Sequence, residues 1–146
     1  MDYFIRNATA VDYESLAEIW LTTSKDAHYF VPGSFWEERK KDLIDLYLPN
    51  SLVWVCTNSL DLILGFIALR GTKIEALFIL PEEQGKGIGK LLIDVVKVYK
   101  EKLNLHVYEK NSRAISFYKN QRFEILNRII EKNTNEWEYV MRWRNN

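Results

Sequence analysis

The sequence is poor in cysteine, in excess charge and in long apolar runs, and each of these shortages excludes a class of function. Cys56 is the only cysteine, so the chain can form no internal disulfide and no cysteine-based metal cluster. The formal net charge is zero, whereas a nucleic-acid-binding domain usually carries a basic excess. The longest uncharged apolar stretch, residues 62–69, is too short to span a bilayer. We therefore predict neither a nucleic-acid partner nor a membrane partner.

The first residues lack the basic and apolar zones of a secretion signal, which favours a cytoplasmic protein. Apolar residues make up 47% of the chain, enough for a sizeable core, and no linker or repeat divides it. We therefore expect one domain over residues 1–146. Cys56 follows an apolar run, which indicates a buried thiol.

The spacing of apolar residues alternates in some segments and follows helical periodicity in others. Ser34 and Glu37 have the spacing of a capping box, which marks the start of a second helix. The predicted order is β-α-α-β-β-β-α-β-α-β-β, with the second to fourth strands as an antiparallel meander. The expected strands are residues 3–7, 52–57, 63–70, 73–79, 103–107, 123–130 and 137–143, and the expected helices are residues 11–23, 34–48, 88–99 and 112–121.

A glycine-rich loop between the fourth strand and the third helix is the most informative part of the sequence. Glycines lack side chains, so the backbone can approach a ligand closely there. The first amides of the helix have no partner within it and carry the positive end of its dipole, which favours an anion such as a pyrophosphate. Two lysines add positive charge. The loop residues that we predict to bind phosphate are Gln84, Gly85, Lys86, Gly87, Ile88, Gly89 and Lys90.

Two other phosphate-binding motifs do not fit these residues. A P-loop needs serine or threonine after its glycine-lysine pair, but Leu91 follows here, and it needs glycine where Gln84 stands. A dinucleotide fingerprint needs a different glycine spacing and a strand-end acid. The remaining alternative is a strand-to-helix turn whose glycines serve tight packing. Three alternating glycines with a glutamine and two lysines favour phosphate binding instead.

The loop resembles the pyrophosphate motif of the GNAT superfamily of N-acetyltransferases, which has the spacing of Gln84, Gly87 and Gly89. A second similarity lies in residues 111–118, where an asparagine, an alanine and an aromatic-tyrosine pair follow the family's spacing. The similarity covers essentially the whole chain in the same element order, and it is nearest to the YjaB-like bacterial acetyltransferases. One departure is Arg122, where the family usually has glycine.

The resemblance implies an α/β (α+β) fold with a mixed, mostly antiparallel sheet of six to seven strands, flanked by about four helices. Its two central strands, residues 74–79 and 103–107, would splay apart in a V that receives acetyl-CoA as the acyl donor. The pantetheine would pair with the exposed backbone of the first of these strands. The implied coenzyme-binding residues are the loop residues 84–90 with Leu77, Phe78, Ile79, Asn111 and Tyr118.

The resemblance also implies roles in the direct attack of a primary amine on the thioester. Tyr118 matches the family's general acid, and a core tyrosine is the alternative. Glu75 on the central strand and His28 in an aromatic loop are candidate bases, and each could instead be structural. The N–H of Phe78 is a candidate donor to the oxyanion. Asn111 contacts the coenzyme, caps the following helix, or does both.

Other polar residues are expected to play smaller parts. Strand alternation places Glu75 on the face of Leu77 and Ile79. His106 follows a strand residue and is expected to pack. Two histidines without a fitting acidic cluster predict no catalytic metal. The cations around the fourth helix are interpreted as a solvated face, with the 3′-phosphate of the coenzyme as the alternative partner; they are Lys110, Arg113, Lys119 and Arg122.

Three functions are compatible with these residues: an acetyl-CoA-dependent N-acetyltransferase, a non-catalytic acyl-CoA-binding sensor, and a purely structural domain. Tyr118 together with a candidate base favours the enzyme. Its acceptor would be a small amine, a protein N-terminus or a protein lysine. The sequence is compatible with a monomer or a homodimer.

Overall fold

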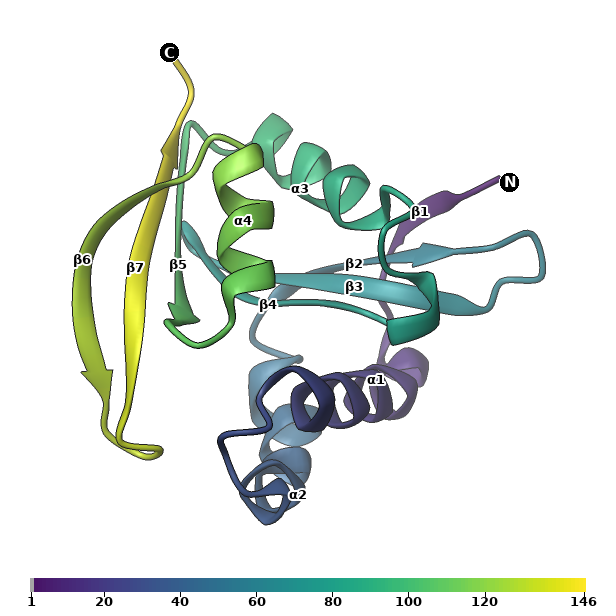
Figure 1. Ribbon diagram of the computed structural model, residues 1–146. Helices are drawn as coiled ribbons and strands as arrows, with labels where there is room; N and C mark the ends of the chain where they lie inside the picture. Colours follow the sequence, from purple (N-terminus) through teal and green to yellow (C-terminus); the bar gives the residue numbers. More distant parts are fainter. Residues whose placement is uncertain (1) are drawn as a thin grey trace.

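A computed structural model describes residues 2–146, and its elements follow the order expected from the sequence (Figure 1). Short helical turns lie at Ala10–Asp12, Leu43–Tyr47 and Pro81–Glu83. The strands and α-helices are β1 (Phe4–Asn7), α1 (Tyr13–Ala27), α2 (Gly33–Asp42), β2 (Leu52–Thr57), β3 (Ile63–Arg70), β4 (Lys73–Ile79), α3 (Ile88–Tyr99), β5 (Lys102–Tyr108), α4 (Ser112–Asn120), β6 (Glu124–Glu131) and β7 (Glu136–Arg144).

The strands form one seven-stranded sheet in the order β1-β2-β3-β4-β5-β7-β6. Neighbouring strands are antiparallel except β4 and β5, which run parallel. Within the described chain these two strands pair at Lys73 and Asn104 alone and then diverge (Figure 1). The Asn104 N–H donates to the Thr72 carbonyl at 2.9 Å and closes the apex. The predicted V-shaped splay is therefore confirmed, and it separates a β1–β4 half from a β5–β7–β6 half.

Helices cover the two faces of the sheet unequally (Figure 1). α3 and α4 pack on one face, where Leu92 and Tyr118 share a core with strand residues such as Leu105. α1 covers the β1–β4 half on the other face, through residues such as Leu16. On that face the aromatic loop after α1 reaches β5 by packing on Tyr108. This arrangement leaves the V accessible between the two halves.

The alternation expected along β4 is interrupted at Glu75. The register of β3 and β4 shifts there, so Glu75 has no partner in β3. Ile74, rather than Glu75, joins Leu77 and Ile79 in the core under α3. The prediction that Glu75 shares the face of Leu77 and Ile79 is therefore wrong, because a β-bulge changes which side of the strand a residue faces.

Two other local predictions fail for physical reasons. α2 begins at Gly33 without a side-chain cap, so no capping box forms at Ser34. Glu37, expected in that box, instead forms an ion pair with Lys25 of α1. His106 is exposed rather than packed, because it points away from the core that α3 and α4 cover. The buried state of the Cys56 thiol is confirmed.

The turn between α4 and β6 keeps the shape that glycine favours although Arg122 occupies it. Arg122 has a φ of 70°, in the left-handed region. Its N–H donates to the Lys119 carbonyl and the Phe123 N–H donates to the Tyr118 carbonyl, both at 3.0 Å. The departure from the family's usual glycine therefore leaves the turn intact while storing backbone strain.

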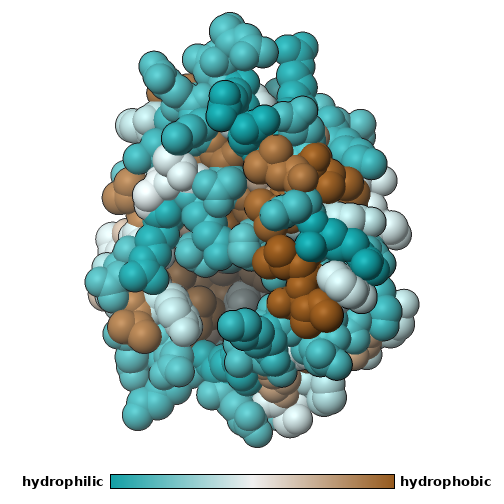
Figure 2. Space-filling view, turned by 90° about the vertical axis from the view of Figure 1, so that its left-hand side faces the viewer, coloured by the Kyte–Doolittle hydropathy of each residue, from teal (hydrophilic) through white to brown (hydrophobic). Residues whose placement is uncertain are grey.

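β6 lies at the edge of the sheet and exposes Ile125, Leu126 and Ile130, beside Trp137 of β7. The surface on this side is hollowed, and hydrophobic residues gather beside the hollow (Figure 2). Within residues 2–146, no helix combines the length and the hydrophobicity needed to cross a bilayer.

Candidate active site

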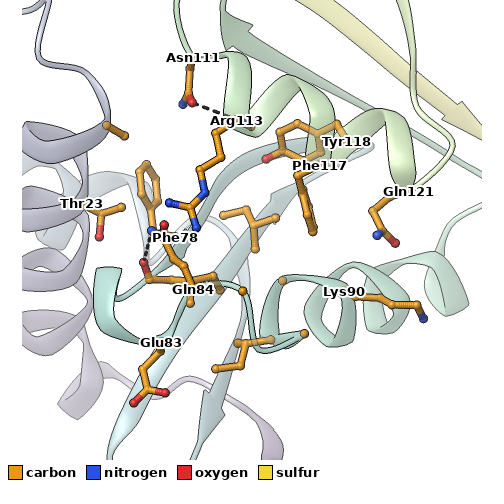
Figure 3. A pocket seen from close by; sticks show the side chains of 18 of the residues that line it. Thr23, Phe78, Glu83, Gln84, Lys90, Asn111, Arg113, Phe117, Tyr118 and Gln121 are labelled. Carbon is orange, nitrogen blue, oxygen red and sulfur yellow. Dashed lines mark hydrogen bonds between the residues drawn. The ribbon is translucent and has the colours of Figure 1, made fainter.

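A cavity of about 450 Å³ opens between β4, the glycine-rich loop and α4 (Figure 3). It extends from the N-terminus of α3 to the end of α1, so it brings together segments from distant parts of the sequence. Of the residues predicted as sites, the structure places these on the wall of the cavity: His28, Leu77, Phe78, Ile79, Gln84, Gly85, Gly87, Ile88, Gly89, Lys90, Asn111 and Tyr118. Glu75 and Lys86 are not among the lining residues.

The start of α3 presents unpaired main-chain donors to this cavity. Gly87 precedes the helix in a left-handed conformation with a φ of 89°, and no side chain caps the helix. Leu91 makes the first helical hydrogen bond, from its N–H to the Gly87 carbonyl at 3.1 Å. The N–H groups of Ile88, Gly89 and Lys90 therefore lack helical partners, and the helix dipole adds positive potential. This end of the cavity suits an anion.

Packing around the loop explains two of its residues. A Cβ on Gly89 would lie 3.0 Å from the ring of Phe117, so glycine lets α3 approach α4 closely. The Gln84 amide donates to the Ile79 carbonyl at 3.0 Å. The structure thus gives Gln84 a role in holding the loop against β4, and its contact with a coenzyme stays a prediction.

The cations near the loop differ in their placement. Lys86 pairs with Glu83 at 3.1 Å, and Lys90 pairs with Asp94 at 2.6 Å. Arg113 lines the cavity, and its guanidinium points into it (Figure 3). The sequence pattern favoured a solvated face for Arg113. Its position two residues after Asn111, in the first turn of α4, is the signal that could have placed it here.

The edge of β4 that faces the V has main-chain groups directed into it. Leu80 donates its N–H to the Leu64 carbonyl of β3 at 2.9 Å. Hydrogen-bonded positions in an antiparallel pair recur every second residue, so Phe78 also faces β3 with its main chain. Leu77 and Ile79 therefore direct their N–H and C=O groups towards the V, where the Ile79 carbonyl already accepts the Gln84 amide. This ladder argues against the Phe78 N–H as the oxyanion donor and favours its two neighbours.

Asn111 connects α4 to the loop after α1. Its side-chain oxygen accepts the Ala114 N–H at 3.2 Å, so the predicted capping role is confirmed. The side-chain amide nitrogen of Asn111 therefore lies on the side of His28, 3.3 Å from its Nε2. An amide N–H can only donate, so Nε2 accepts and the proton of the neutral ring sits on Nδ1. The cap of one helix thereby sets the tautomer of a histidine on another segment.

His28 is poorly suited to be a base in this setting. It is 8% exposed and packs against the rings of Phe30, Trp36 and Tyr108. Burial lowers its pKa to about 4, an effect that the charge of Glu138 opposes. Its Nδ1 is buried and has no hydrogen-bond partner among residues 2–146. A ring with this pKa and this tautomer is a weak proton acceptor at neutral pH.

Tyr118 sits in the wall of the cavity between α4 and β4 (Figure 3). Its ring packs edge-on against Phe117 and Phe123. Burial raises the pKa of its hydroxyl well above the ordinary value of 10.0, and no other group within residues 2–146 contributes to that shift. The hydroxyl therefore keeps its proton at neutral pH, as a general acid requires.

Glu75 lies outside this cavity. It is exposed at the bulge of β4, and Lys73 is 3.8 Å from its carboxylate. The structure therefore does not bring it together with Tyr118, and its role as a base stays a prediction. Among residues 2–146, no group of three or more His, Cys, Asp or Glu side chains is arranged to hold a metal ion.

Comparisons with known proteins agree with this geometry. A family model described as an acetyltransferase (GNAT) domain matches residues 49–125. The chain is 32% identical over 140 residues to the peptidyl-lysine N-acetyltransferase YiaC of Escherichia coli, and the match covers 95% of each. It is also 32% identical over 124 residues to the peptidyl-lysine N-acetyltransferase YjaB of E. coli, which covers 85% of this chain and 84% of YjaB.

Solved structures show the same fold. The solution structure of apo YjaB from E. coli matches with a TM-score of 0.87 and 26% identity, over 100% of both chains. The crystal structure of PaiA N-acetyltransferase from Thermoplasma acidophilum in complex with coenzyme A matches with a TM-score of 0.78 and 20% identity, over 99% of both chains.

Proposed function

Because this chain belongs to the GNAT family of acetyltransferases and transfers an acetyl group from acetyl-CoA to an amine, we propose that its acceptor is the side chain of a protein lysine. Two relatives that are 32% identical to the chain carry the name peptidyl-lysine N-acetyltransferase. A match over 95% of both chains in one of them supports the same acceptor class here.

One observation gives the main support for the proposed site: the unpaired main-chain amides at the start of α3 and the open edge of β4 line a single cavity. The N–H groups of Ile88, Gly89 and Lys90 are placed to bind the diphosphate of the coenzyme. In this proposal the outward main-chain groups of Leu77 and the outward N–H of Ile79 bind its pantetheine amides as an added strand would. Arg113 supplies a positive charge on the same wall. When bound, acetyl-CoA supplies an acetyl group activated as a thioester.

Tyr118 is the residue that holds a proton for the departing sulfur. Its hydroxyl is protonated at neutral pH and lines the cavity without a bond to a neighbouring side chain. Asn111 orients the start of α4 by capping it, and so it helps to position Tyr118 on the same helix. The apolar rings around Tyr118 exclude water, which keeps the proton available for transfer.

A Tyr118→Phe variant tests this role. We expect kcat for lysine peptides to fall about 100-fold, since one general acid typically contributes 10²–10⁴-fold, while the Kd for coenzyme A changes less than about twofold. Thiol release with a lysine peptide measures the first quantity and calorimetry the second. Tyr99→Phe, on the exposed side of α3, is the matched control. Equal losses in kcat and in coenzyme affinity would contradict the acid role.

The acceptor is tested with the unmodified protein. Lysine peptides, peptides with a free N-terminus and no lysine, and small polyamines are compared for thiol release with acetyl-CoA. We expect the lysine peptides to give the highest kcat/KM. A preference for small polyamines or for N-termini would show that the acceptor proposal is wrong while leaving the acetyltransferase activity in place.

A further inference from the structure

A second hollow lies where β4, β5 and β6 curve around the apex of the V. It holds about 500 Å³, and we call it the β4–β6 groove. Charged and titratable side chains predominate among its lining residues, which include Lys73, Glu75, His106, Glu131, Lys132 and Glu138. None of these residues lines the coenzyme cavity. The groove and the coenzyme cavity are therefore lined by different residues.

The groove and the core under α3 and α4 lie on opposite faces of the sheet. Leu105 and Val107 of β5 pack in that core. His106 and Tyr108 alternate with them and so point to the other face. Tyr108 is the direct partner of Glu138 in the β5–β7 ladder, and directly paired residues share a face. His106, Tyr108 and Glu138 thus form one surface on the side away from α3 and α4.

Glu138 is the unusual member of this surface. It is 9% exposed, and its carboxylate accepts no hydrogen bond from any residue in 2–146. Its carboxylate lies 3.6 Å from the Nδ1 of His106. Other carboxylates of these strands have strong cationic partners: Glu136 pairs with Lys110 and Glu124 with Arg142, both at 2.9 Å. Glu138 thus presents to the groove a mostly buried carboxylate that has no lysine or arginine partner within residues 2–146, so it is free to accept a hydrogen bond from a bound cation.

Tyr108 and His28 connect Glu138 to the coenzyme cavity through side-chain packing. Tyr108 packs edge-on against His28, with ring centroids 4.9 Å apart, and His28 lines that cavity. The negative charge of Glu138 is also close enough to oppose the effect of burial on the pKa of His28. An acceptor bound in the β4–β6 groove would therefore approach the V from the side opposite the coenzyme helices.

We propose that Glu138 binds the ammonium group of the acceptor lysine and takes a proton from it. This inference rests on the proposed function. The nitrogen lone pair released in this way forms the C–N bond to the acetyl carbon as the C–S bond breaks. Of the two protons that the nitrogen loses, one goes to Glu138 and then to solvent. The other replaces the proton that Tyr118 gives to the sulfur.

The first test uses Glu138→Gln, which keeps the shape of the side chain and removes its charge. We expect kcat/KM for a lysine peptide to fall about 100-fold at pH 7. A lysine amine has a pKa near ~10.4, so at pH 10 much of it is already neutral and the loss should shrink below about tenfold. The other titratable groups facing Glu138 are present in both proteins: His106, Tyr108, Glu131, Lys132, Lys73 and Glu75. The ratio therefore removes the part of their titration that the two proteins share.

Two variants accompany this measurement. Glu136→Gln lies on the same strand, and its carboxylate has its own partner in Lys110, so its kcat/KM should stay within about twofold. Glu138→Asp should recover part of the activity if proton transfer matters. A wild-type-to-Glu138→Gln ratio that is near one, or that stays constant from pH 7 to pH 10, overturns the proposal. Melting temperatures of all three variants report whether the fold is retained.

The second test needs no turnover. Nα-acetyl-lysine methylamide is titrated into the protein with coenzyme A, and the imidazole signals of His106 are followed by NMR. We expect these signals to shift with the lysine probe and not with its uncharged norleucine analogue, and Glu138→Gln to weaken binding at least about tenfold. Equal binding by Glu138→Gln overturns the proposal. Absence of thiol release by the wild type would instead refute the proposed function.

Discussion

Replacing Gly87 with alanine tests the idea that the head of α3 is shaped for an anion. Gly87 has a φ of 89°, and a Cβ added there would meet nothing within 4 Å. The substitution therefore introduces backbone strain and no clash. A non-glycine residue in the left-handed region costs roughly 1–2 kcal/mol. A smaller unfolded-state entropy offsets about 0.4–1 kcal/mol of that cost.

The variant can respond to this strain in two ways. If the loop keeps its shape, the free energy of unfolding should fall by about 1 kcal/mol and coenzyme affinity should stay unchanged. If the loop relaxes to relieve the strain, stability recovers, but the amides of Ile88 and Gly89 lose their arrangement. The Kd for coenzyme A should then rise up to about tenfold, because 1.4 kcal/mol corresponds to a factor of ten. The loss of unfolding free energy and the loss of binding free energy for coenzyme A should together equal the free energy of the strain.

Gly71→Ala is the matched control, because Gly71 also has a positive φ, 62°, with nothing within 4 Å of an added Cβ. It lies in the β3–β4 turn, away from the cavity, so it should lower stability without changing affinity. Urea unfolding measures the first quantity and calorimetry with coenzyme A the second. If Gly87→Ala leaves both unchanged while Gly71→Ala is destabilised, the reasoning about the loop is refuted.

Two further predictions concern residues in unusual environments. Arg122→Gly should raise the free energy of unfolding by about 0.5–1 kcal/mol, because a φ of 70° suits glycine, and a melting temperature below the wild type's would contradict this. His28 has its pKa lowered by burial from 6.5 to about 4, so the unfolded chain binds a proton that the native protein does not. Stability should therefore fall by up to about 3 kcal/mol as the pH drops from about 6.5 to about 4, and His28→Gln should remove that part of the slope in pH-dependent urea unfolding.

The sequence was sufficient to predict the elements, because the apolar spacing changes between period two and helical period wherever strands and helices alternate. The V between the two central strands came from the resemblance and not from any spacing. The alternation of apolar residues could not predict the bulge at Glu75, because the bulge depends on how β3 and β4 align. That single irregularity reversed the face on which Glu75 was expected.

The parts of the site that depend on backbone conformation were predicted best from the sequence. Gly87 indicated where α3 begins, and the structure shows it there in the left-handed conformation, which favours glycine because glycine has no Cβ. Side-chain roles were harder, because they depend on packing between distant segments. Arg113 was interpreted as a solvated cation. No role was predicted for Glu138, since a glutamate in a strand usually faces water. The single-domain organisation, the cytoplasmic location and the oligomeric state stay predictions.

β4 is held on one side by a ladder with β3 that is interrupted at Glu75, and beyond Lys73 it is open on the other side. The proposed recognition along that open side uses peptide groups, which all residue types except proline share. Substitutions such as Leu77→Ile should therefore leave it largely intact, provided that the alignment with β3 survives. If the proposed sites are right, side chains along the coenzyme edge can change with little effect on coenzyme binding, whereas changes in the side chains that contact the acceptor would alter acceptor preference.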